Sequence, residues 1–213
     1  MSSNFLQALA GTHLYPITDQ HLSRLSHAEQ VVHLSNCGAP LIQLREKADH
    51  PLRFFEQAEA AVRVARDRGV RIIINDRVDI ALALKADGVH LGQEDLPPEA
   101  ARRILGNDAI IGFSTHSLEQ ASLAAKMPVD YVAIGPIFST TTKQSANLPL
   151  GLEGLARVRK ALGTVPLVAI GGITGENQGP VLQAGADVVA VISDIWLAAK
   201  DAANKTKHPL HIS

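Results

Sequence analysis

The sequence predicts an α/β protein, a single (β/α)8 TIM barrel, and three observations favour this fold. Short runs of β-branched residues alternate with helix-like segments along the 213 residues, as in parallel sheets built from βαβ units. Eight such runs occur, which is the number of strands in this barrel. Runs such as RIII at 71–74 and VVAVI at 188–192 are almost continuously apolar, as expected of strands covered on both faces.

The expected strands follow one another at regular intervals. They cover residues 13–17, 41–45, 71–75, 88–91, 110–114, 131–135, 166–170 and 188–193. Helices are expected in the gaps, for example at 52–68, 118–126, 152–162 and 176–184. Helix-like segments end in the turns CGAP at 37–40, KADG at 85–88, MPVD at 127–130 and AGAD at 184–187. A doubly wound open sheet is the alternative fold, but it seldom contains eight evenly spaced units.

The composition is that of an ordinary globular domain, with 46% hydrophobic and 19% charged residues. No linker-like or low-complexity segment divides the chain. We therefore expect one domain over 1–213, with the barrel at about 13–200 and a loose tail at 201–213. The net charge is −1 and no basic or acidic block occurs, so nothing indicates a nucleic-acid or membrane partner.

Cys37 is the only cysteine, which excludes an intrachain disulfide and a multi-cysteine metal site. Because Asn36 and Gly38 flank it, we expect a small buried thiol at the end of a helix. The first residues lack a basic segment followed by an apolar one, and no long apolar run occurs elsewhere. These features predict a cytoplasmic protein.

Polar and glycine residues follow the expected strands at their carboxyl ends, where this barrel places active sites. They are Gln43 to Lys47, Asn75 and Asp76, Gln93 to Asp95, Ser114 to His116, Ser139 to Lys143, Gly171 and Gly172, and Ile192 and Ser193. A bland surface would scatter such residues over both ends of the barrel. The sequence therefore predicts one active site at this rim.

A phosphate site is predicted where the last two strands end. Glycines such as Gly171 and Gly172 let backbone N–H groups approach a phosphate closely, and Ile192 and Ser193 follow the neighbouring strand. The segment 174–176 would open the next helix and add its dipole. Alternatively, the two glycines serve only a tight turn.

A magnesium site is predicted at Asp76 and Asp95, which follow adjacent strands. Two carboxylates leave room for the waters and phosphate oxygens with which Mg²⁺ completes its coordination. Taken singly, each aspartate is as well explained as a cap or turn residue, and Asp76 could cap the helix that follows it.

Three cations, Arg45, Lys47 and Lys143, are expected beside the carboxylates. Cations next to a magnesium pair stabilise a departing diphosphate, although a solvated surface is the alternative for the segment 45–47. Two phosphorylated ligands in one pocket indicate a transferase.

Several of these segments resemble the thiamine-phosphate synthase family. They are QLREK at 43–47, IINDRVDIALALKADGVHLGQEDLP at 73–97, IGFSTHSLEQA at 111–121, AIGPIFSTTTK at 133–143, GLEGL at 151–155 and VAIGGIT at 168–174. The similarity is collinear from Leu14 to Ile195. GGI alone is a weak signal, whereas QLREK, the ND…QxD pair and TxTK together are specific. Ser139 departs from the proline expected before the TxT segment, which should loosen that loop more than it alters the chemistry.

The resemblance implies condensation of 4-amino-2-methyl-5-pyrimidylmethyl diphosphate with a thiazole phosphate, with release of diphosphate. It implies that the pyrimidine diphosphate is contacted by Gln43, Leu44, Arg45, Glu46, Lys47, Asn75, Ser114 and Lys143. Arg45, Lys47 and Lys143 would act catalytically, and Asp76 and Asp95 would bind Mg²⁺. The thiazole phosphate would be held by Thr140, Thr141, Thr142, Gly172, Ile192 and Ser193. The mechanism implied is dissociative and requires no side-chain nucleophile.

Two other functions are compatible with parts of this pattern. A thiazole tautomerase of the same fold would need the phosphate site and a general base such as His116, but neither Asp95 nor Lys143. His116 precedes Ser117 at the start of a helical stretch, which favours local capping or packing. A sensor that only binds a phosphorylated heterocycle would have little use for a metal and diphosphate clamp. The oligomeric state and the carboxylation of the thiazole stay open.

Overall fold

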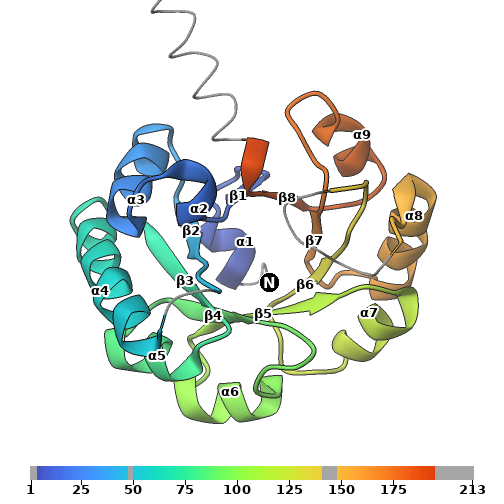
Figure 1. The fold of residues 1–213 in the computed structure, drawn as a ribbon. Helices are drawn as coiled ribbons and strands as arrows, with labels where there is room; N and C mark the ends of the chain where they lie inside the picture. Colours follow the sequence, from blue (N-terminus) through green and yellow to red (C-terminus); the bar gives the residue numbers. More distant parts are fainter. Residues whose placement is uncertain (1–3, 48–49, 141–147, 195–213) are drawn as a thin grey trace, which may run out of the picture.

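The computed structural model describes residues 4–47, 50–140 and 148–194 and shows a barrel of parallel strands (Figure 1). The strands are β1 (Leu14–Pro16), β2 (Leu41–Leu44), β3 (Arg71–Asn75), β4 (Gly88–Leu91), β5 (Ile110–Thr115), β6 (Tyr131–Ile134), β7 (Leu167–Ile170) and β8 (Val188–Val191). Their order is β1-β8-β7-β6-β5-β4-β3-β2. A parallel bridge between Ile17 and Gln43 brings the first and last strands of this order together. The predicted eight-stranded barrel is therefore confirmed.

Helices surround the strands as an outer ring (Figure 1). The ring contains α3 (His27–Asn36), α4 (Pro51–Asp67), α5 (Val78–Leu84), α6 (Pro98–Leu105), α7 (Leu118–Ala124), α8 (Gly151–Leu162) and α9 (Gln178–Gln183). The short helices α1 (Asn4–Ala8) and α2 (Gln20–Ser23) were not predicted. The expected helix at 176–184 begins only at Gln178, so the segment 174–176 lies in the preceding loop and does not open it.

Two apolar layers hold the fold together. The larger lies between the strands and the helix ring, and it includes Leu44 and Phe54, both almost completely buried. The smaller fills the barrel interior and contains Phe5, Tyr15 and Tyr131. Because Phe5 belongs to α1 and stacks on the first residue of β6, α1 closes the amino-terminal end of the barrel. Because α1 fills the amino-terminal end, the carboxyl-terminal end of the barrel is the end available for an active site.

Aspartates at the amino-terminal rim join neighbouring strands. Three aspartates each immediately precede a strand, namely Asp87 before β4, Asp130 before β6 and Asp187 before β8. The side chain of each accepts a backbone N–H near the start of the previous strand in the sequence, from Ile72, Ile111 and Leu167 respectively. The three acceptor distances are all 2.8 Å. Arg102 of α6 also donates to Asp130 at 2.7 Å. The aspartates of the turns KADG, MPVD and AGAD therefore have a structural role, as expected at this end of a barrel.

Cys37 corrects one expectation. It does follow the last residue of α3, but its side chain is exposed, because the cap of this helix lies on the outer surface. In the ranges 4–47, 50–140 and 148–194, no helix is long and apolar enough to cross a membrane. The expected tail at 201–213 lies outside the described residues.

Candidate active site

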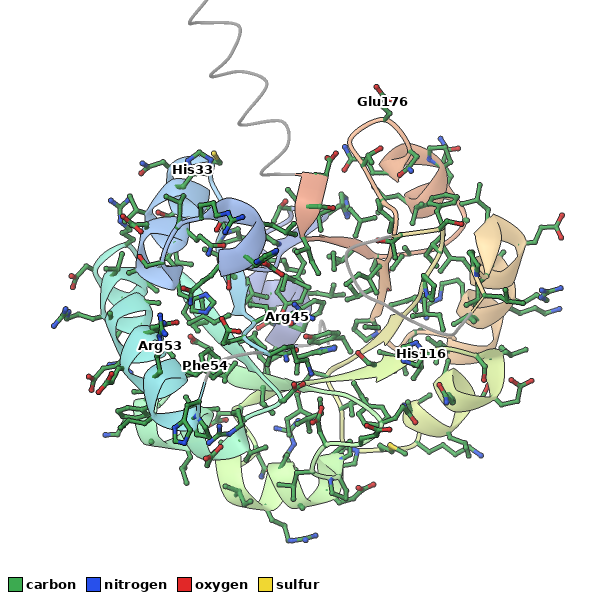
Figure 2. The ribbon with its side chains drawn as sticks, in the orientation of Figure 1. His33, Arg45, Arg53, Phe54, His116 and Glu176 are labelled. Atoms are coloured by element: carbon green, nitrogen blue, oxygen red, sulfur yellow. The ribbon has the colours of Figure 1, made fainter. Side chains whose placement is uncertain are left out.

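A pocket opens at the carboxyl ends of β5 to β8. Its walls come from Ser114, His116, Pro136, Thr140, Gly172 and Ser193, among others. The site extends toward β2, whose following segment carries Arg45. Figure 2 shows Arg45 near the centre of the barrel, whereas Arg53 and Glu176 lie toward its periphery. The predicted rim therefore contains a pocket at the ends of β5 to β8.

One side of the pocket is shaped by two glycines after β7. Gly171 and Gly172 have φ angles of +101° and +67°, a region that favours glycine. A Cβ atom on Gly171 would stand 2.7 Å from the Cα of Pro136, and one on Gly172 would stand 2.7 Å from the carbonyl oxygen of Ser139. A side chain at either position would therefore displace the loop after β6. These glycines form a tight turn and also line the pocket.

The other residues predicted for a thiazole phosphate divide into two groups. Thr140, Ile192 and Ser193 line the same pocket as Gly172. Thr141, Thr142 and Lys143 lie outside the described residues. Asn177, which was not predicted, donates to the carbonyl oxygen of Gly172 at 2.9 Å and accepts from the N–H of Thr174 at 2.8 Å. This asparagine holds the loop after β7 in place.

Asp76 and Asp95, the predicted metal ligands, interact with each other at the ends of β3 and β4. Burial raises the pKa of Asp76, the ammonium of Lys47 opposes the rise, and the carboxyl of Asp95 adds to it. Helix α5 begins after Arg77, which makes no side-chain capping hydrogen bond. Asp95 accepts the N–H of Gly92 at 2.6 Å, so one of its oxygens also stabilises a turn.

The donor set fits Mg²⁺, which binds one or two carboxylates and takes its remaining ligands from water and phosphate. Both carboxylates offer oxygen and interact with each other, and among the described residues the charge of Lys47 acts on Asp76. In the part of the chain that the structure describes, no group of three or more His, Cys, Asp or Glu side chains forms a metal cage. Such a pair would hold the ion only together with a substrate.

Of the predicted cations that the structure describes, Lys47 lies beside this pair. Lys47, whose side chain is half exposed, forms an ion pair with Asp76. Arg45 forms an ion pair with Asp19 at 3.3 Å, and its backbone N–H donates to the hydroxyl of Thr18 at 3.1 Å. Arg45 is therefore anchored by the segment after β1. Asp19 was not predicted, because no nearby motif indicates that it faces Arg45.

Leu44 and Glu46 differ from the polar members of the QLREK segment. The side chain of Leu44 is completely buried in the layer between strands and helices, so only its backbone is available to a ligand. Glu46 accepts the backbone N–H of Lys47 at 2.8 Å. Alternation along β2 explains why Leu44 faces the helices whereas Gln43 faces the barrel interior, and Glu46 lies beyond the end of that strand.

Gln43, Asn75 and Ser114 bring uncharged polar groups to the barrel mouth. Gln43 and Asn75 are nearly completely buried, and Ser114 lines the pocket. The Nδ2 atom of Asn75 is buried and has no hydrogen-bond partner among the described residues. A buried amide donor without a partner costs free energy, so this atom indicates that a ligand belongs beside it.

His116 lines the pocket and makes the local contacts that the sequence favours. Its Nδ1 atom lies 2.7 Å from the carbonyl oxygen of Gly135, and its backbone N–H donates to Gln120 at 2.7 Å. Ser117, the next residue, caps α7. Figure 2 places His116 on the side of the barrel where α7 and α8 lie. The imidazole is therefore tied to the strand-six loop.

Comparisons with known proteins place this site in a family. A family model described as thiamine monophosphate synthase matches residues 14–195. The chain belongs to this family. A thiamine-phosphate synthase of Chloroflexus aurantiacus is 45% identical over 88% of the chain and 86% of the relative. A thiamine-phosphate synthase of Clostridium novyi is 45% identical over 90% of the chain and 97% of the relative.

A solved structure supports both family and fold. The thiamine phosphate pyrophosphorylase of Pyrococcus furiosus is 36% identical, with a TM-score of 0.76 over 91% of this chain and 95% of that one. The resemblance to the thiamine-phosphate synthase family is thereby confirmed, and with it the prediction of an enzyme of the transferase class. The roles of individual site residues stay predictions.

Proposed function

We propose that this protein is a thiamine-phosphate synthase. It joins 4-amino-2-methyl-5-pyrimidylmethyl diphosphate to 4-methyl-5-(2-phosphoethyl)thiazole and releases thiamine phosphate and diphosphate. If the thiazole is carboxylated, its carboxylate also leaves as CO2. The observation that carries the proposal is the spatial order of one rim. A pair of carboxylates and the cations after β2 lie at the ends of β2 to β4. The pocket wall formed by Gly171, Gly172 and Ser193, which we call the cradle, lies at the ends of β7 and β8. Two different phosphorylated ligands would thus meet end to end.

The thiazole phosphate binds in the cradle. Backbone groups at Gly172 and Ser193 offer N–H donors there, because Gly172 carries no side chain that would occupy the space of a phosphate oxygen. Thr140 closes the same pocket from the loop after β6. This arrangement orients the thiazole so that its nitrogen faces the centre of the barrel mouth.

The pyrimidine diphosphate binds across the mouth toward β2. Gln43, Asn75 and Ser114 contact the ring, and the unpartnered Nδ2 of Asn75 supplies one donor. Arg45, Lys47 and Lys143 contact the diphosphate. Asp76 and Asp95 would hold Mg²⁺, which would supply positive charge to the phosphate oxygens.

In the proposed reaction the bond between the methylene carbon and the diphosphate oxygen breaks first. Its electron pair leaves with diphosphate, and the pyrimidine ring stabilises the carbocation. The thiazole nitrogen then donates its lone pair to the carbon and forms the new bond. Arg45 and Lys47 stabilise the charge that grows on the leaving group. No proton transfer by His116 is needed, which agrees with its contact to Gly135.

The test is to incubate the purified protein with both substrates, with and without EDTA, and to follow thiamine phosphate and diphosphate. Equal amounts of both products, formed only when Mg²⁺ is available, are expected. Isomerisation of a thiazole precursor without diphosphate release would instead identify the tautomerase.

The proposed location is the cytosol, where the exposed thiol of Cys37 stays reduced.

A further inference from the structure

A hydrogen-bond network crosses the barrel interior and ends at two of the residues proposed to hold the pyrimidine. It consists of Gln43, Tyr15, Tyr131, His90 and Ser114, which we call the interior network. The Nε2 of Gln43 donates to the hydroxyl of Tyr15 at 3.1 Å, and that hydroxyl lies 3.2 Å from the hydroxyl of Tyr131. The Nδ1 of His90 lies 2.9 Å from Tyr131, and its Nε2 lies 2.8 Å from Ser114.

Each hydroxyl in this network has one hydrogen to donate, and this fixes which member donates to which along the network. Because Gln43 donates to Tyr15, the hydroxyl hydrogen of Tyr15 goes to Tyr131, its other polar side-chain neighbour in the described part of the chain. The hydrogen of Tyr131 then goes to Nδ1 of His90. This nitrogen accepts, so the imidazole carries its hydrogen on Nε2 and donates it to Ser114. Within the network, Tyr15, Tyr131 and His90 each accept once and donate once, whereas Gln43 only donates and Ser114 only accepts.

The opposite direction leaves a buried hydrogen without an acceptor. If Nδ1 of His90 donated to Tyr131, then Tyr131 would donate to Tyr15, which already accepts from Gln43. With the amide of Gln43 oriented as in this structure, the hydrogen of Tyr15 would then have no acceptor among the described residues. The opposite direction would require the amide to turn so that its Oε1 faces Tyr15. An unsatisfied hydroxyl at a completely buried position is costly.

We infer that Tyr15, Tyr131 and His90 are positioning residues that set the hydrogen-bonding polarity of the pyrimidine site. The inference rests on the proposed function, in which Gln43 and Ser114 contact the ring. One hydrogen of Nε2 is held by Tyr15, and the Oε1 atom of Gln43 is the acceptor that the amide offers to a ligand. With His90 donating to it, the hydroxyl of Ser114 is left to donate.

This polarity matches an aminopyrimidine. The exocyclic amino group donates and a ring nitrogen accepts, which complements an acceptor at Gln43 and a donor at Ser114. In an analogue with an oxo group in place of the amino group, the oxo oxygen, which is an acceptor, would face the acceptor Oε1 of Gln43. The interior network therefore selects the amino form of the substrate over its oxo analogue.

The barrel is built to keep the network dry and in place. The ring of Phe5 stacks on that of Tyr131 with centroids 3.9 Å apart and covers it from the amino-terminal end. A Cβ atom on Gly112 would lie 2.0 Å from Cζ of Tyr131, so this glycine makes room for the ring. Burial raises the pKa of both tyrosine hydroxyls far above the ordinary value, so both keep their hydrogens.

The first test reads the direction without any activity. NMR of protein with ¹⁵N-labelled histidine distinguishes the two neutral tautomers, and a His90→Gln variant assigns the resonances of His90. The hydrogen is expected on Nε2 in the protein without ligands. A hydrogen on Nδ1, or on both nitrogens, would overturn the inference. This measurement stands even if the protein fails to make thiamine phosphate, so it separates the network from the proposed function.

The second test separates positioning from packing. Tyr131→Phe keeps the ring on Phe5 but removes both hydrogen bonds, whereas Phe5→Leu disturbs the packing and keeps both. Loss of one hydrogen bond to the ring should raise KM for the pyrimidine diphosphate about tenfold in Tyr131→Phe, while KM for the thiazole phosphate changes less than about twofold.

The same variant should discriminate less well between the amino substrate and its oxo analogue, measured by competition. Phe5→Leu should lower the melting temperature and leave the ratio of the two KM values unchanged. A Tyr131→Phe enzyme with the wild-type ratio of KM values and wild-type discrimination would show that the network serves packing only. That outcome would overturn the inference while leaving the proposed reaction intact.

Discussion

The ammonium of Lys47 forms an ion pair with the carboxylate of Asp76, so a residue proposed to contact diphosphate touches one proposed to bind Mg²⁺. The pair joins the segment after β2 to the end of β3. In the proposed complex Lys47 would contact the diphosphate, and Asp76 would belong to the magnesium site beside it. The ion pair thus occupies the place where the two subsites meet.

The first prediction concerns the two carboxylates. Asp76→Asn and Asp95→Asn should each lower kcat by roughly a hundredfold or more, since a metal ion supplies several kcal/mol to a departing charge. The Mg²⁺ concentration for half-maximal rate should also rise. Steady-state diphosphate release over a Mg²⁺ titration measures both effects.

Asp79→Asn is the matched control, because Asp79 lies on α5 only a few residues away and pairs with Arg77 in solvent. It should keep wild-type kinetics. Full activity of the wild-type protein in excess EDTA would contradict the magnesium assignment. If Asp79→Asn lost as much kcat as the other two variants, the losses would be explained by destabilisation of this segment and not by loss of a metal ligand.

Much of the fold could be predicted because its signals are local. The strand that contains RIII is bounded in the structure as the sequence indicates, at Arg71–Asn75. A run of apolar residues between turns is sufficient for that inference. Helix α1 could not be predicted in the same way, because it has only five residues and its order depends on Phe5 meeting Tyr131 inside the barrel.

For the site, the sequence predicts which residues lie near one another at the strand ends, but not which side chains pair. Strand order brings Asp76 and Asp95 to adjacent ends, so their proximity follows from the fold. The pairing of Arg45 with Asp19 does not, because a charged side chain after a strand has several possible partners. His90 was missed for a similar reason. A histidine within GVHL can face either layer, and only the closed barrel places it between Tyr131 and Ser114.

Lys143 gives the second prediction, which rests on the sequence because this residue lies outside the described residues. Lys143→Ala should lower kcat about a hundredfold, as for one preorganised electrostatic contact, and should affect thiazole binding little. Lys143→Arg should restore only part of the rate, since a planar guanidinium is not a compact ammonium. Single-turnover measurements establish that chemistry limits the rate. Lys160→Ala, an exposed change on α8, is the control, and a wild-type rate in Lys143→Ala would refute the role.

The third prediction concerns stability at the opposite end of the barrel. Asp130→Ala removes the acceptor for the backbone N–H of Ile111 and the partner of Arg102. Because a buried donor is left unsatisfied, the free energy of unfolding should fall by about 2 kcal/mol. Denaturant unfolding measures the loss, and both KM values should stay unchanged. The exposed Asp108→Ala provides the control. A large change in KM in Asp130→Ala would argue against a purely structural role for this rim.

The fourth prediction is a pH dependence at the start of α3. Hydrogen bonds from the hydroxyl and backbone N–H of Ser26 hold the pKa of Glu29 below its usual value. A depressed pKa means that the stabilisation is present above the unfolded-state pKa and is lost as pH falls through the folded-state pKa. The difference in melting temperature between wild type and Glu29→Ala should therefore shrink on acidification. Glu59→Ala, at an exposed position of α4, should show no such trend.

The last prediction concerns the cradle. Gly172→Val places a side chain where the φ angle of +67° and the nearby Ser139 oxygen leave no room. The displaced loop should lose a backbone hydrogen bond to the phosphate, which raises KM for the thiazole phosphate about tenfold or more. KM for the pyrimidine diphosphate should change far less, because that substrate binds toward β2. Gly179→Val is the matched control, since a Cβ atom there meets nothing within 4 Å. An equal rise of both KM values in Gly172→Val would place this glycine outside a dedicated phosphate site, and the phosphate would then have to bind elsewhere on the rim.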